Sequence, residues 1–178
     1  SNGNLAVYLG EPEDIPDRRF GFLLPNRREY AKTHYNCTGY VLPFDPAGLG
    51  AVDQTRRQLG YGSETLIICT IGGTSIGRDL LELCARAYPL IRSAHPDLRM
   101  ILVCGPRLET DSLDVPEGVE IRGYVPELYR HLAVCDLAIV QGGGTVTLEL
   151  TALRRPFLYF PLEGHYEQQI AVAERLAR

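Results

Sequence analysis

The sequence predicts an α/β domain built on a doubly wound parallel sheet. From residue 65 onward, short apolar segments of strand type alternate with helical segments, with little chain between them. This alternation is typical of parallel strands joined by right-handed crossover helices. Glycine-rich turns follow two of the strand segments, where a strand leads directly into a helix. With 178 residues, 45% of them hydrophobic and 22% charged, the chain is long enough for one well-buried domain.

Five strands are expected in this sheet. Each is a short apolar run of the kind that parallel sheets bury on both faces. We expect the common doubly wound order, in which the first and fourth strands are neighbours and ligands bind at the crevice between them. The strand segments are 65–71, 99–104, 119–122, 136–140 and 157–160.

Helices are expected between the strands. The longest follows the first strand over about 78–94, with Pro89 in its second half. Shorter helices are expected over 127–134, from Thr145 onward, and over 166–176. The spacing of apolar residues predicts the following buried face for the long helix: Leu80, Leu83, Cys84, Ala87 and Leu90 or Ile91.

The first part of the chain is less regular. Residues 5–9 are of strand type, and 52–59 suit a short helix that leads into the sheet. The stretch 11–46 is interrupted by Pro, Gly, Asn and Arg and has no sustained period, so it is expected to be a boundary segment. Ser1 and Asn2 are interpreted as the remnant of an expression tag.

Composition excludes several classes of function. A net charge of −4 and a pI near 5.6 argue against nucleic-acid binding, which calls for a basic face. No segment approaches the roughly 20 apolar residues of a membrane span. The five cysteines are far apart and form no C-x-x-C pair, so no zinc site is expected, and no other metal or cofactor. We expect a cytoplasmic protein, either free or peripheral at the inner membrane face.

The stretch 141–149, Gln-Gly-Gly-Gly-Thr-Val-Thr-Leu-Glu, carries the most specific chemistry. It follows the strand segment 136–140 and opens a helix, so its glycines occupy a strand-to-helix turn. Residues without Cβ allow backbone N–H groups to approach a ligand, and a helix start favours an anion. Thr145 can cap the helix or donate its hydroxyl to a phosphate oxygen. Glu149 lies about one turn further, where its carboxylate can accept hydrogen bonds from both ribose hydroxyls.

A second glycine turn, Gly-Gly-Thr-Ser-Ile-Gly over 72–77, follows the first strand. In the expected strand order it faces the turn at 142–144, and two such turns indicate a diphosphate. The spacing is that of a nucleoside-triphosphatase loop, but Arg78 and Asp79 stand where that loop needs Lys followed by Ser or Thr. The dinucleotide fingerprint is also incomplete, so an NAD site remains only an alternative.

Two further motifs accompany these turns: Gly123-Tyr-Val-Pro126, and Pro-Leu-Glu-Gly-His-Tyr-Glu-Gln-Gln over 161–169. With the four motifs in this order, the chain from about residue 39 to 178 resembles the C-terminal, donor-binding half of a GT-B glycosyltransferase, a Rossmann-like domain. It is similar above all to the group that contains the N-acetylglucosaminyltransferase that makes lipid II, which has a family 28 C-terminal domain.

The resemblance implies a site for a UDP-sugar, which acts as co-substrate. It places the diphosphate at Gly72, Gly73, Thr74, Gly143, Gly144 and Thr145, the uracil at Tyr124 and Val125, the ribose at Glu149, and the transferred sugar at Gln168, Gln169 and His165. Each of these residue types also has an ordinary role. Tyr124 can be a packing aromatic, His165 a solvated loop residue, and the two glutamines a polar first turn.

The sequence departs from the family pattern at two points. Gln141 stands where many relatives carry His, and the chain lacks the basic residue that relatives often carry shortly after Gly39, for which Arg107 is a candidate substitute. The resemblance also implies that residues 1–40 are the remnant of an N-terminal domain and that 41–178 form the donor-binding domain. In the family, the N-terminal domain holds the acceptor and the general base.

The function predicted is donor binding in an inverting glycosyltransferase that transfers a sugar, plausibly N-acetylglucosamine, from a UDP-sugar to an acceptor hydroxyl. The acceptor, a lipid carrier, a natural product or another sugar, would be held by the N-terminal domain. Two alternatives remain open. One is a non-catalytic nucleotide-sugar binding or regulatory subunit, and the other is a sugar-nucleotide epimerase of the same architecture.

Overall fold

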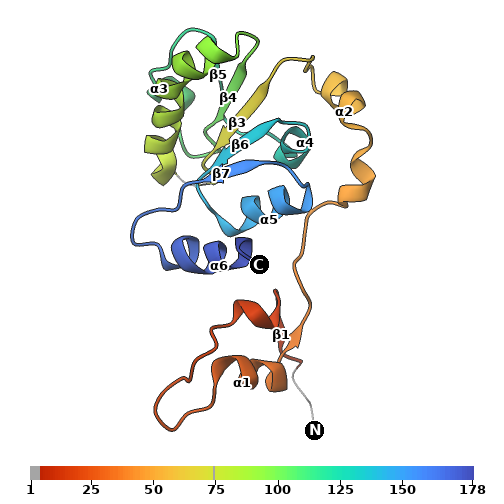
Figure 1. Ribbon diagram of the computed structural model, residues 1–178, viewed down its shortest axis with the longest axis vertical. Coiled ribbons are helices and arrows are strands. Elements are labelled where there is room, and N and C mark those ends of the chain that lie inside the picture. The colour runs from red at the N-terminus through yellow and green to blue at the C-terminus, as the bar shows by residue number, and fades with distance from the viewer. Residues whose placement is uncertain (1–4, 74) are drawn as a thin grey trace. The chain divides into compact units, whose positions relative to one another are not determined.

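The structure is a computed structural model that describes residues 5–73 and 75–178 (Figure 1). The chain divides into two compact units. One contains the chain up to Pro43 together with Ala173–Arg178, and the other is Phe44–Val172. The sequence analysis expected a different kind of division, between a remnant of an N-terminal domain (1–40) and a donor-binding domain (41–178). That division stays a prediction.

The first unit contains a helix that the sequence analysis did not predict. Within the supposed boundary segment, α1 (Arg27–His34) begins after Asn26, whose side-chain oxygen accepts a hydrogen bond of 2.9 Å from the Arg28 N–H. The stretch 11–46 thus contains a regular helix that its lack of a sustained period did not indicate. The other elements of the unit are β1 (Val7–Tyr8) and β2 (Asn36–Cys37), which pair in parallel, the 3₁₀ turn Pro12–Asp14, and α6 (Ala173–Leu176).

The second unit is built on a five-stranded sheet in which every pair is parallel. The order is β5-β4-β3-β6-β7, so the first and fourth strands of the sheet, β3 and β6, are neighbours. This confirms the doubly wound α/β fold that the alternating segments predicted. The strands are β3 (Leu66–Thr70), β4 (Arg99–Val103), β5 (Val119–Arg122), β6 (Leu137–Val140) and β7 (Phe157–Tyr159).

Helices cover both faces of this sheet (Figure 1). Strand residues alternate between the two sides: Ile67 and Cys69 of β3 pack beneath α3, whereas Leu66 and Ile68 pack beneath α4 and α5. The helices are α2 (Val52–Gln58), α3 (Arg78–Ala94), α4 (Leu128–Leu132) and α5 (Gly144–Ala152), with 3₁₀ turns at Pro46–Leu49, Ser75–Gly77 and Thr110–Ser112.

The buried face of α3 differs from the prediction. Leu80 and Cys84 are buried as expected, but Leu83 and Leu90 are 44% and 75% exposed. The helix is rotated so that the other residues of its buried stripe are Leu81, Ala85 and Tyr88. Of the alternatives Leu90 and Ile91, the structure bears out Ile91, which packs against the core beside this stripe.

The end of the chain also differs from the single helix expected over 166–176. Residues Glu167–Val172 form a π-helix, and only Ala173–Leu176 are α-helical. π-Helical segments are rare and occur often at functional sites. In the part of the chain that the structure describes, no helix is both long enough and apolar enough to cross a membrane.

Candidate functional site

The two glycine turns leave the same edge of the sheet from neighbouring strands. Thr70, at the end of β3, is in register with Val140, at the end of β6. The turn that contains Gly72 and Gly73 therefore lies beside the turn that contains Gly142. Of the residues expected at the diphosphate, Thr74 lies outside the described residues.

Three of the glycines have open space where a side chain would be. A Cβ placed on Gly72, Gly73 or Gly143 would have no atom of the described residues within 4 Å. Gly72 has a φ of +75°, a conformation that only glycine adopts without strain. The backbone at these positions is thus accessible to a ligand at the carboxyl edge of the sheet.

Two other glycines hold this edge together. Gly105, in the turn after β4, has a φ of +74°, and a Cβ there would overlap the carbonyl oxygen of Gly72. A Cβ on Gly77 would lie 2.5 Å from both Ile71 and the side-chain oxygen of Gln141. Gln141 is 7% exposed, so the residue that stands in place of the family histidine packs against the start of α3.

The start of helix α5 lies at the same edge. Its N-cap residue is Gly143, so the first of the two roles considered for Thr145, capping the helix, does not apply. Thr145 lies inside the first turn and is exposed, and its hydroxyl has no partner among the described residues. The helix begins one residue earlier than predicted, at Gly144.

Glu149 lies further along α5 and is half-buried. Burial raises the pKa of its carboxyl group above the ordinary value of 4.5. No residue within 5–73 and 75–178 donates a hydrogen bond or forms an ion pair with this carboxylate. It is therefore an unused acceptor on the helix that starts at the glycine turn.

Tyr124 and Val125 follow β5 at the same edge of the sheet. The Tyr124 side chain is 70% exposed and has no ring contact in the described part of the chain, so it does not have the packing role considered as an alternative. Val125, in contrast, packs against the core beneath α4 and α5. Tyr124 offers a free aromatic face, and Val125 offers only its backbone.

The segment after β7 brings three further predicted residues to this edge. His165 and Gln169 are exposed, and the Gln169 N–H donates to the His165 carbonyl at 3.0 Å. The Gln168 side-chain oxygen accepts a 2.9 Å hydrogen bond from the Leu162 N–H, which fixes the loop. Gln168 therefore has a structural role, while its amide N–H₂ group stays available for a ligand.

Glu167 was not predicted, although it lies beside Gln168. Its carboxylate oxygen lies 3.0 Å from the place that a Cβ on Gly144 would occupy, close to the start of α5. The Glu167 carboxylate thus lies near the start of α5, where a negative charge is favourable. The sequence gives no sign of the contact between Glu167 and Gly144, because that contact depends on the π-helix in which Glu167 lies.

No cluster of three or more metal-ligating side chains is found within the described residues. The site therefore consists of glycine-turn and helix-start amides, one unpaired carboxylate, one exposed aromatic ring and a polar loop. These groups suit a ligand that combines anionic oxygens, vicinal hydroxyls and a flat ring.

Comparison with known proteins identifies the family of the chain. Residues 67–178 match the model of the glycosyltransferase family 28 C-terminal domain. An uncharacterized glycosyltransferase of Methanopyrus kandleri is 29% identical over 141 residues, which are 79% of this chain and 39% of that protein. A UDP-N-acetylglucosamine–N-acetylmuramyl-(pentapeptide) pyrophosphoryl-undecaprenol N-acetylglucosamine transferase of Carboxydothermus hydrogenoformans is 26% identical over 123 residues, 65% of this chain and 33% of that protein. The chain thus spans less than half the length of these relatives.

Solved glycosyltransferase structures share the fold. The glycosyltransferase of kitacinnamycin superposes with a TM-score of 0.62 at 19% identity, over 97% of this chain and 40% of that one. The calicheamicin glycosyltransferase gives a TM-score of 0.57 at 17% identity, over 96% and 38% of the two chains. The resemblance to GT-B glycosyltransferases is thereby confirmed. With the family model matching more than half of its length, the chain belongs to the glycosyltransferase family 28 C-terminal domain family.

Proposed function

We propose that residues 41–178 are the donor-binding domain of an inverting glycosyltransferase that transfers N-acetylglucosamine from a UDP-linked donor to an acceptor hydroxyl. The observation that carries the proposal is the open backbone of two adjacent glycine turns beside the start of a helix whose N-cap is a glycine. That arrangement suits a diphosphate, because N–H groups and the helix dipole converge on one volume. The name of the Carboxydothermus hydrogenoformans relative supports the choice of UDP-N-acetylglucosamine.

The contacts to the ribose, the base and the transferred sugar are assigned to the residues that lie beyond the diphosphate position. Glu149 is one helical turn or more from the diphosphate position and accepts hydrogen bonds from the ribose hydroxyls. The exposed ring of Tyr124 stacks on the uracil, and the Val125 backbone contacts the edge of the base. The π-helical segment supplies Gln168, Gln169 and His165 to the sugar hydroxyls.

In this reaction, an acceptor hydroxyl attacks the anomeric carbon and the bond to the diphosphate oxygen breaks. The amides around Gly73 and Gly143, and the hydroxyls of Thr74 and Thr145, stabilise the charge that develops on the leaving diphosphate. No metal is required for this role. The general base and the acceptor site are proposed to lie in a part of the protein outside residues 1–178, and the base takes the acceptor proton.

Isothermal titration of the 178-residue chain with UDP and UDP-N-acetylglucosamine tests the donor site. Glu149→Ala is expected to weaken UDP binding about 10- to 100-fold, because a hydrogen bond to a charged acceptor contributes about 1.5–3 kcal/mol. Glu117→Ala is the matched control, since Glu117 is an exposed carboxylate before β5, at the opposite edge of the sheet. Absence of UDP binding, or an unchanged affinity in Glu149→Ala, rules out the ribose assignment.

The same ligands distinguish the alternative functions in the full-length protein. A transferase forms a glycoside and releases UDP only when an acceptor is present. Release of UDP without a glycoside indicates an epimerase-type reaction. Binding without release under any condition indicates a regulatory module.

A further inference from the structure

A second cavity lies at the edge of the sheet opposite to the glycine turns. Its volume is about 400 Å³, within the 300–1,000 Å³ that is usual for small-molecule sites. Val134 and Arg155 line it, and they precede β6 and β7, so the cavity lies at the amino ends of strands whose carboxyl ends carry the glycine turns. A ligand here is therefore separate from a nucleotide bound at those turns.

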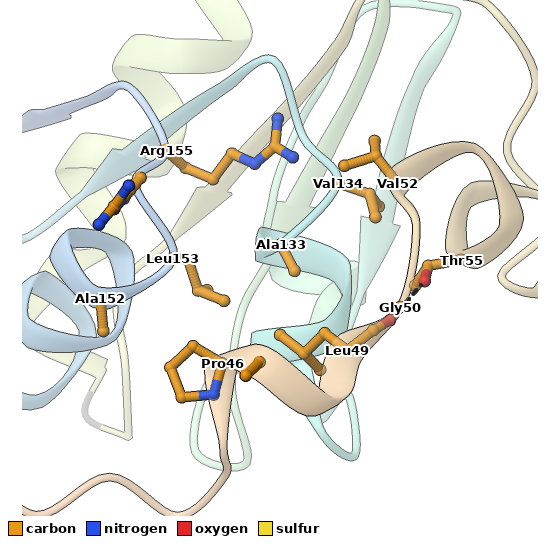
Figure 2. Close-up of a pocket in the computed structure, with 12 residues that line it drawn as sticks. Pro46, Leu49, Gly50, Val52, Thr55, Ala133, Val134, Ala152, Leu153 and Arg155 are labelled. Atoms are coloured by element: carbon orange, nitrogen blue, oxygen red, sulfur yellow. Dashed lines mark hydrogen bonds between the residues drawn. The ribbon is translucent and has the colours of Figure 1, made fainter.

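The interior of the cavity is mainly apolar. Leu49 and Leu153 pack against the core beneath α4 and α5, and each also faces the cavity. Figure 2 shows Leu49, Ala133 and Leu153 around the space, with Pro46 beside Leu49 and Arg155 above them. The apolar side chains thus line the cavity on one side of the Arg155 guanidinium.

Arg155 supplies the cationic group, and no partner for it is found among residues 5–73 and 75–178. The Arg155 Nε atom is buried and makes no hydrogen bond, and the described residues provide no ion pair to its guanidinium. The C-terminal end of α5 attracts a positive charge, but it does not account for a buried donor without an acceptor. An anion in the cavity can accept hydrogen bonds from the terminal N–H groups of this guanidinium.

Arg154 adds a second charge to the lining. It has a φ of +52°, the left-handed conformation that follows many helices and that glycine adopts without strain. The Arg154 N–H donates to the Thr151 carbonyl at 3.0 Å, and the Arg155 N–H donates to the Leu150 carbonyl at 3.1 Å, so the turn is well formed. The chain thus places two adjacent arginines, one of them strained, beside an apolar cavity.

We propose that this cavity binds a small anion with a short apolar chain, the anionic head group at Arg155 and the chain against Leu49 and Leu153. The head group is a carboxylate or a phosphate monoester, both of which accept the forked N–H groups of arginine. Such a ligand pairs with the charge of the Arg155 guanidinium and removes the apolar lining from water at the same time.

Titration calorimetry with octanoate, octyl phosphate and 1-octanol tests the proposal. At least one anion is expected to bind about tenfold or more tightly than 1-octanol, because one charged hydrogen-bonded contact contributes that factor. Arg155→Met should remove this difference, and Arg86→Met should retain it, since Arg86 is exposed on α3, on the other face of the sheet. The anion that binds more tightly identifies the head group.

Methyl NMR of the unsubstituted chain locates the bound anion and does not require that Arg155→Met folds. The anion should shift the Leu49 and Leu153 methyl signals and leave those of Ile71, beside the glycine turns, in place. Four results would overturn the proposal. In the titrations, these are equal binding of the anions and 1-octanol, no binding of any of the three, and an unchanged preference in Arg155→Met. The fourth is displacement of the anion by UDP.

Discussion

Gly105 and Gly72 form a matched pair for testing how the carboxyl edge of the sheet is held together. Their φ angles are +74° and +75°, so alanine is equally strained at both. They differ in their surroundings. A Cβ on Gly105 would overlap the Gly72 carbonyl oxygen, whereas a Cβ on Gly72 would have no described atom within 4 Å.

The expected losses of stability follow from these two observations. Alanine in the left-handed region costs about 1–2 kcal/mol, which is the whole effect expected for Gly72→Ala. Gly105→Ala has the same strain and an added overlap with a neighbouring backbone, which costs about 1–3 kcal/mol more. The total for Gly105→Ala is then about 2–5 kcal/mol.

Urea denaturation followed by far-ultraviolet circular dichroism measures the difference. With a slope of about 1–3 kcal/mol per molar, Gly105→Ala should lower the midpoint by about 1 M or more and Gly72→Ala by clearly less. Equal midpoints for the two variants would show that the turn after β4 does not support the turn after β3, and the reasoning would be refuted.

Three further predictions concern the proposed donor site. Gly73→Ala should retain or slightly raise stability, by about 0.4–1 kcal/mol, while weakening UDP binding measured by calorimetry, because Gly73 has no left-handed φ and open space above it. In a pH series, UDP affinity should fall as pH drops through the raised pKa of Glu149, and Glu149→Gln should lack this step. The stability of Glu149→Gln relative to the unsubstituted chain should rise as pH rises through the same pKa, because burial penalises only the ionised carboxyl. Tyr124→Ala should lower UDP affinity by about 1–3 kcal/mol and Tyr124→Phe much less, with unfolding midpoints unchanged in both; equal losses would exclude stacking.

The strands and their order were predictable because parallel strands are buried on both faces and appear as continuous apolar runs. Helix α1 was not predictable from periodicity, since Ala31 is its only buried residue among those described. Its one local signal is the capping pair formed by Asn26 and a glutamate three residues later, Glu29. A short polar helix in a small unit has no apolar stripe to detect.

The residue types of the candidate site were also predictable, because turns and helix starts depend on neighbouring residues. Their exact conformations were not. The π-helix of Glu167–Val172 and the hydrogen bond from Leu162 to Gln168 depend on contacts between segments, and local propensity carries no information on them. The approach of Glu167 to Gly144 could not be predicted for the same reason.

The glycines show most clearly what the structure adds. In the sequence, nothing distinguishes Gly72, Gly77, Gly105 and Gly143, since each is a glycine in a turn region after a strand segment. The structure separates them into two kinds. Gly77 and Gly105 have no room for a side chain, because another part of the protein occupies it, so substitution there should cost stability first. Gly72 and Gly143 have room that the protein leaves empty, and substitution there should change ligand binding more than folding. We expect folded variants of Gly72 and Gly143 to lose UDP binding, and folded variants of Gly77 and Gly105 to retain it. Only a ligand that lies on the turns produces this pattern.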